Sequence, residues 1–119
     1  MVFINFSNHP SNIWSKKQLE ETRQYGEIID IHFPNIEPYL NKKDILDMVD
    51  DYFKLIISYK DKDEIIVHIM GEMTFCFALI ERLKQNNIKC IASTSQRIVN
   101  TISSNKKETI FEFCTYREY

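Results

Sequence analysis

Glycine and proline are scarce in this sequence, which has two glycines and three prolines among 119 residues. That scarcity excludes the collagen-like, low-complexity and disordered classes. The chain also lacks a basic excess, because 15 Lys and Arg stand against 17 Asp and Glu and give a net charge of −2. A broad basic surface for duplex nucleic acid or for a membrane is therefore excluded.

Long apolar runs and paired cysteines are missing as well. No run approaches the roughly 18–20 residues of a membrane span, and Met1 is not followed by a signal-peptide pattern. The cysteines, Cys76, Cys90 and Cys114, form no C-x-x-C pair and no His/Cys spacing for zinc. Cys76 and Cys90 lie in apolar stretches and are expected to be small core residues. This usage predicts a reducing, cytoplasmic location.

Apolar segments alternate with amphipathic segments along the chain. The expected strands are residues 2–6, 27–33, 64–70 and 88–92. Helices are expected to begin after Ser15, after Asn41 and near Glu72, and Gln18 and Asp44 have the spacing of capping boxes with the first two. The third helix is apolar on most sides and should be the most buried. Alternation from residue 98 onward, around a polar turn at 103–107, predicts a hairpin.

Strands that alternate with helices indicate a parallel sheet with right-handed crossovers. We therefore expect a single α/β domain over residues 1–119, a three-layer Rossmann-like sandwich with a mostly parallel sheet and a C-terminal β-hairpin. In such sheets, ligands bind outside the carboxyl ends of the strands, where the strand order reverses. The segments after the strands are therefore the candidate sites.

The segment after the first strand contains Ser7, Asn8 and His9. Histidine titrates near neutral pH, so His9 is a candidate general acid or base; the alternative is a turn-stabilising histidine. His32, at the end of the second strand, and His68, within the third, are expected to be structural.

The segment after the third strand contains Gly71, Glu72 and Thr74. A glycine between strand and helix allows backbone N–H groups to approach a phosphate. Neither G-x-G-x-x-G nor G-x-x-x-x-G-K-[ST] occurs, so no dinucleotide cofactor is expected. Glu72 either complements the helix dipole or contacts a ribose hydroxyl or base edge.

The segment after the fourth strand contains Ser93, Thr94, Ser95 and Arg97. Three hydroxyls and a guanidinium suit a phosphodiester, because arginine can donate two N–H bonds to phosphate oxygens. A hydroxyl-rich turn with only local hydrogen bonds is the alternative.

Three short motifs in these segments resemble small, stand-alone proteins with the CRISPR-associated Rossmann fold of type III systems, a group that includes ring nucleases. The motifs are Asn5-Phe6-Ser7-Asn8-His9-Pro10, Met70-Gly71-Glu72-Met73-Thr74 and Ala92-Ser93-Thr94-Ser95-Gln96-Arg97. The resemblance implies a homodimer that binds a two-fold-symmetric cyclic oligoadenylate across its interface, and some members cleave this ligand without metal. These motifs contain no lysine, whereas many relatives use one near the scissile phosphate.

Carried over to this chain, the resemblance makes His9 and Arg97 the catalytic candidates. The implied ligand-binding residues are Ser7, Asn8, Gly71, Glu72, Thr74, Ser93, Thr94 and Ser95. A non-catalytic nucleotide sensor or sponge, and an accessory protein that binds a partner through its aromatic hairpin, remain alternatives. A metal-dependent nuclease is disfavoured, because the aspartates between residues 44 and 51 have helix-face spacing.

Overall fold

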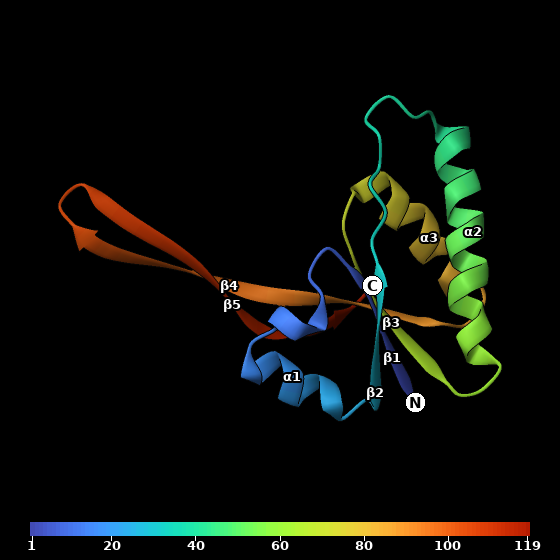
Figure 1. The fold of residues 1–119 in the computed structure, drawn as a ribbon, viewed down its shortest axis with the longest axis horizontal. Helices are drawn as coiled ribbons and strands as arrows, with labels where there is room; N and C mark the ends of the chain where they lie inside the picture. The colour runs from blue at the N-terminus through green and yellow to red at the C-terminus, as the bar shows by residue number, and fades with distance from the viewer.

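A five-stranded sheet is the centre of the structure, a computed structural model that describes residues 1–119 (Figure 1). Its strand order is β2-β1-β3-β4-β5. The strands are β1 (Val2–Ser7), β2 (Glu27–His32), β3 (Ile65–Met70), β4 (Lys89–Ser103) and β5 (Lys106–Glu118). The pairs β1–β2, β1–β3 and β3–β4 are parallel, and β4–β5 is antiparallel. The mostly parallel Rossmann-like sheet with a C-terminal hairpin is thus confirmed.

Helices cover both faces of this sheet and make three layers. The helices are α1 (Lys16–Arg23), α2 (Lys42–Lys60) and α3 (Met73–Gln85), and a short 3-10 turn, η1 (Ser11–Ile13), precedes α1. Figure 1 shows α1 on one side of the sheet and α2 and α3 on the other. The strand order reverses between β1 and β3, because β1 is followed by β2 on one side and by β3 on the other. The ligand-binding rule for open α/β sheets therefore points to the carboxyl ends of these two strands.

Alternation along β1 divides the core between the two faces. Ile4 and Phe6 belong to a cluster of 17 buried residues under α2 and α3. Phe3 belongs to a smaller cluster with Ile66 and Ile91, which packs against aromatic side chains on the α1 side. Cys76 and Cys90 are buried free thiols in the larger cluster, as predicted.

The helix starts follow the predicted capping chemistry with one difference. Asn41 and Asp44 form a complete capping box at the start of α2. Ser15 caps α1 by accepting a hydrogen bond from the Gln18 N–H. The Gln18 side chain does not return to Ser15 but donates to the Tyr116 hydroxyl at 3.3 Å, because β5 passes close to α1.

The end of the fourth strand is where the prediction was wrong. β4 continues without interruption from Lys89 to Ser103, so residues 93–97 are strand and not a loop. Regular pairing explains this, since β5 supplies a partner for each of Ser93, Thr94, Ser95 and Arg97. The three hydroxyls and the guanidinium are therefore spread along a strand instead of converging in a turn.

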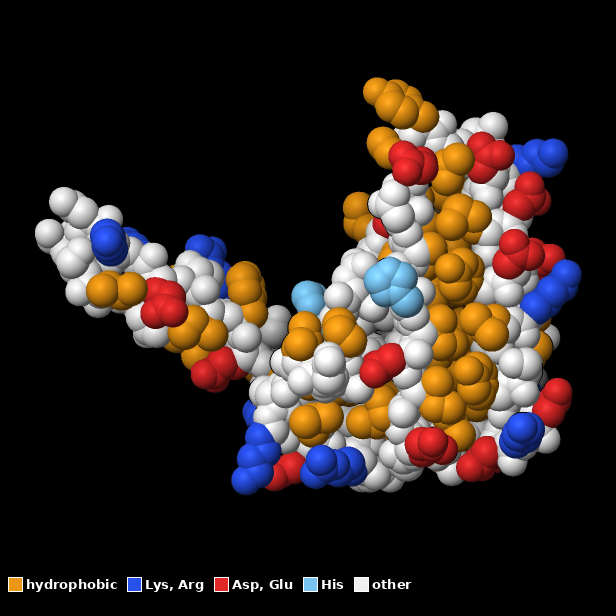
Figure 2. Space-filling model, viewed as in Figure 1, with side chains coloured by type: hydrophobic (Ala, Val, Ile, Leu, Met, Phe, Trp, Pro, Cys, Tyr) orange, Lys and Arg blue, Asp and Glu red, His pale blue; other side chains and the backbone are white.

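The outer parts of β4 and β5 project from the body as an arm (Figure 1). The molecule measures 53 × 39 × 21 Å, and its radius of gyration is 16.3 Å. A compact chain of this length would have a radius of gyration of about 13.5 Å. Apolar side chains remain exposed along the arm (Figure 2). Ile102 and Phe111, at 63% and 67% exposed, belong to this part of the chain. We call residues 98–110 the arm tip.

Candidate ligand cleft

A cleft of about 670 Å³ lies at the carboxyl ends of β1 and β3, on the α1 side of the sheet. Ser7 and Met70 end the two strands, and Ser93 lines the cleft from β4. The remaining walls are the loop after β1, the start of α1 and the part of β5 from 110 to 113. The cleft therefore lies at the topological switch point.

Three of the predicted site residues share this cleft: Ser7, His9 and Ser93. His9 is exposed at its mouth, whereas Ser7 is buried. The residues of the first segment do not all point the same way, because Asn8 lines a separate hollow of about 380 Å³ with His32 and Glu72.

Arg97 is not among the residues that line the cleft. It pairs across the strands with Phe111, which does line it, so Arg97 lies beside the outer end of the cleft on the arm. The Thr94 hydroxyl is hydrogen-bonded within the hairpin: it donates to the Thr115 carbonyl at 3.1 Å and accepts from the Thr115 N–H at 3.2 Å. Ser95 is exposed, pairs with Phe113 and lies opposite a bulge in β5, where Cys114 has no partner in β4.

The turn after β3 is built for packing and helix capping. A Cβ on Gly71 would overlap the ring of Phe33, so the glycine is required for close contact with a buried side chain. The Glu72 carboxylate accepts from the N–H groups of Thr74 and Phe75, at 3.0 and 2.9 Å, and from the Thr74 hydroxyl. These bonds, led by that from Phe75, lower the pKa of Glu72. The N–H groups that a phosphate would need are thus already bound.

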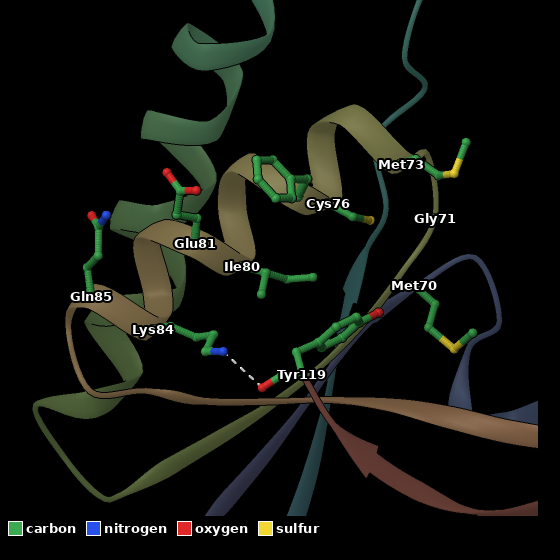
Figure 3. A pocket seen from close by; sticks show the side chains of 10 residues that line it. Met70, Gly71, Met73, Cys76, Ile80, Glu81, Lys84, Gln85 and Tyr119 are labelled. Atoms are coloured by element: carbon green, nitrogen blue, oxygen red, sulfur yellow. Dashed lines mark hydrogen bonds between the residues drawn. The ribbon is translucent and has the colours of Figure 1, made fainter.

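An apolar hollow of about 730 Å³ lies on the opposite side of the sheet, beside α3 (Figure 3). Met73 and Phe77 are exposed there. Even so, α3 has the largest share of buried residues of the three helices, five of 13, as predicted. Tyr119 closes one side, where its hydroxyl donates to the Ile69 carbonyl at 2.6 Å and its main-chain oxygen accepts from Lys84 at 3.0 Å. None of the predicted residues except Gly71 lines this hollow.

A buried polar network supports the floor of the ligand cleft. Asn5 Nδ2 donates to the Asp30 carboxylate at 2.7 Å and to the His9 carbonyl at 2.9 Å. The Asn5 Oδ1 atom faces the Ser7 hydroxyl at 2.8 Å and His68 Nδ1 at 2.9 Å. The network ties the loop after β1 to β2 and β3, which fixes the position of His9 at the mouth.

His68, Lys17 and Trp14 also line the cleft and were missed as site residues. His68 lies in an otherwise apolar strand, which made a packed histidine the natural expectation. The available signal was Asn5, a second polar residue at an apolar strand position, which pairs in register with His68. Lys17 is a lysine at the cleft, a residue type that the three motifs lack, but only the approach of α1 to the sheet brings it there.

Almost the whole chain matches one known protein family. A family model described as the uncharacterized protein MJ1673 family matches residues 1–117. The chain belongs to the MJ1673 family. Searches of curated proteins and of solved structures gave no match. The matched residues include those of the cleft and of the arm.

Two further findings bear on function in this member of the MJ1673 family. No three or more His, Cys, Asp or Glu side chains are grouped so that they could hold a metal ion. None of the helices combines the length and the apolar character needed to cross a membrane.

Proposed function

We propose that this chain binds a cyclic oligoadenylate in the ligand cleft and cleaves it without a metal ion. The observation that carries the proposal is the convergence of Ser7, His9 and Ser93, from two of the three motifs, on one cleft at the switch point. The resemblance to small CRISPR-associated Rossmann-fold proteins of type III systems supplies the ligand class. The buried, unpaired thiols of Cys76 and Cys90 support a cytoplasmic location.

The lining of the cleft suits an adenine nucleotide. Trp14, Phe111 and Phe113 offer aromatic faces and edges to a base, and base stacking on such side chains contributes about 1–3 kcal/mol per base. Lys17 offers positive charge and the Ser93 hydroxyl offers a hydrogen-bond donor to phosphate oxygens. The Ser7 hydroxyl already donates to Asn5 Oδ1 and instead holds the cleft floor in place. A few donors suffice for so small an anion, which is consistent with a net charge of −2.

The proposed reaction uses the ligand's own ribose. The 2′-oxygen attacks the adjacent phosphorus, a 2′-O–P bond forms, and the P–O5′ bond breaks. The products are a 2′,3′-cyclic phosphate and a free 5′-hydroxyl. His9 takes the proton from the 2′-hydroxyl and later releases it to water, and the leaving 5′-oxygen takes up a proton from water. The protein contributes in-line geometry and stabilises charge on the phosphate oxygens.

A two-fold-symmetric ring fits a two-fold-symmetric protein, so the proposal includes a homodimer. We place the dimer contact on the arm. An isolated two-stranded hairpin is marginally stable in water, so packing against a second chain would stabilise the projecting arm. Arg97 belongs to this arm and would reach the ligand phosphates from there. Neither duplex nucleic acid nor a membrane is part of the proposal.

Incubation of the purified chain with labelled cyclic tetra-adenylate and cyclic hexa-adenylate, in the presence of EDTA, tests the proposal. We expect linear products with 2′,3′-cyclic phosphate ends from at least one ring. His9→Ala should lower the cleavage rate by about 100-fold or more while the ring still binds. His32→Ala, a histidine exposed outside the cleft, is the matched control and should leave the rate unchanged.

The other outcomes are equally informative. Tight binding without product would overturn the enzyme and leave a sensor or sponge. Absence of binding to either ring would overturn the ligand class. An accessory protein that binds a partner is the second candidate, favoured by the exposed apolar side chains of the arm; Arg97→Ala would then change no ring binding.

A further inference from the structure

His68 occupies the floor of the ligand cleft and is almost completely enclosed. Its exposed fraction is 2%. The rings of Phe3, Trp14 and Tyr116 surround it with centroid distances of 6.0, 5.8 and 5.5 Å. It nevertheless lines the cleft, two strand positions before the row formed by Ser7 and Met70.

The hydrogen bonds of Asn5 determine which nitrogen of His68 carries the hydrogen. Asn5 Nδ2 faces two acceptors, the Asp30 carboxylate and the His9 carbonyl, so the amide orientation is fixed. Asn5 Oδ1 is then the atom that faces His68 Nδ1 at 2.9 Å. Since a carbonyl oxygen can only accept, Nδ1 must donate, and a neutral ring carries its lone pair on Nε2.

His68 Nε2 is the one buried side-chain nitrogen or oxygen without a hydrogen-bond partner. Leaving such an atom unsatisfied costs about 1–3 kcal/mol, which is unusual in a folded protein. Burial, with a smaller contribution from His9, lowers the pKa of His68 to about 4. The lone pair therefore persists at neutral pH, at the floor of a cleft that can admit a ligand.

We propose that His68 Nε2 accepts a hydrogen bond from an N–H or O–H group of the bound ligand and thereby determines specificity. The inference rests on the proposed function, in which two groups of the ring qualify as the donor. These are the C6 amino group of adenine and a ribose 2′-hydroxyl. Sites that hydrogen-bond a substrate group reject analogues without it, because a buried protein atom is left unpaired.

His68→Asn is the variant that isolates the Nε2 atom. The asparagine amide can still donate to Asn5 Oδ1 in place of Nδ1, but it offers no atom at the position of Nε2. His32→Asn, at an exposed histidine outside the cleft, is the matched control. Circular dichroism and thermal unfolding establish that each variant is folded.

Binding of three rings separates the two possible donors. The probes are cyclic tetra-adenylate, the analogue in which oxygen replaces the C6 amine, and the 2′-deoxy analogue. We expect the unmodified chain and His32→Asn to bind one analogue about 10-fold or more weakly than cyclic tetra-adenylate. In His68→Asn this preference should disappear, and the analogue that was rejected identifies the donor.

A second measurement does not depend on the stability of the variant. Nitrogen NMR of the unmodified chain should show His68 protonated at Nδ1 and unprotonated at Nε2 at pH 7. The Nε2 resonance should shift upfield when cyclic tetra-adenylate is added.

Several outcomes would contradict the inference. If the preference survives in His68→Asn, or if the Nε2 resonance does not move on binding, the role of His68 is overturned while the proposed function stands. A chain that binds none of the rings overturns the proposed function together with this inference.

Discussion

At the scale of single residues, His68 couples the stability of the fold to pH. Its pKa is about 4 in the folded chain, mainly because burial disfavours the charged ring and secondarily because His9 is near. In the unfolded chain a histidine has a pKa of about 6.5, so the unfolded state binds more protons between these values. Stability should therefore fall as the pH drops from about 6.5 to about 4, by about 3 kcal/mol from this residue.

Chemical unfolding from pH 7 to pH 4, with the unmodified chain and His68→Asn compared, measures this effect. Carboxylates such as Glu72 add to the pH dependence of both proteins, so the difference between the two curves isolates His68. The free energy of unfolding of the unmodified chain should approach that of His68→Asn as the pH falls from about 6.5 to about 4. A constant difference would show that His68 takes up its proton at the same pH in the folded and the unfolded chain. The groups that face it are His9, Tyr116 and, through Asn5, Asp30.

Gly71 is required by packing, which predicts the result of adding one methyl group. In Gly71→Ala the new Cβ would overlap the Phe33 ring, which is only 4% exposed and has little room to move. We expect a loss of about 1–3 kcal/mol in the free energy of unfolding, measured by urea titration. Unchanged stability would mean that the Phe33 ring moves easily, and it would contradict the packing role of Gly71.

At the scale of elements, the start of α3 depends on one carboxylate. Glu72 accepts from the Thr74 and Phe75 N–H groups, so Glu72→Ala leaves both donors without a side-chain partner. Loss of such a cap costs about 1 kcal/mol, which thermal unfolding can detect. Glu81→Ala, at an exposed position in the middle of α3, is the control and should change stability little. Equal effects of the two changes would contradict the capping role.

At the scale of the whole molecule, the arm and the body should be separable. No residue of the arm tip belongs to either buried cluster. Replacing residues 98–110 by Asn-Gly, a favoured two-residue hairpin turn, should therefore leave the unfolding temperature within a few degrees of that of the full chain.

Assembly should respond differently from stability. The full chain is expected to sediment as a dimer, with twice the 14.2 kDa mass of one chain, and the arm-deleted chain as a monomer. Phe111→Ser, which keeps the arm but removes an exposed apolar side chain, should weaken the dimer. A full chain that sediments as a monomer would contradict the dimer. A dimer of the chain without residues 98–110 would place the interface outside the arm tip.

Local patterns were enough to predict most of the elements. The apolar runs that became β1, β2 and β3, the Asn41–Asp44 capping box and the helix start at Glu72 all depend on neighbours in sequence. The pairing of β4 with β5 could not be predicted from such local patterns. The polar residues Ser93 to Arg97 have the composition of a turn, yet β5 makes them part of one long strand.

Local sequence pattern was sufficient to predict the class of the fold, because the spacing of apolar residues decides which faces of strands and helices can be buried. It also predicted Ser7 and His9 as candidate site residues, because they lie at or just after the end of the first strand, and both line the cleft. The sequence also predicted Ser93 as a site residue, and Ser93 lines the same cleft. Tertiary structure alone brought Lys17 to the cleft, placed Arg97 on the arm, and gave Gly71 and Glu72 their roles in packing and capping. It also brought His68 to Asn5 across 63 positions of the chain. The physical reason is that strand order and pairing set these contacts, and they join residues far apart in sequence that no local pattern connects.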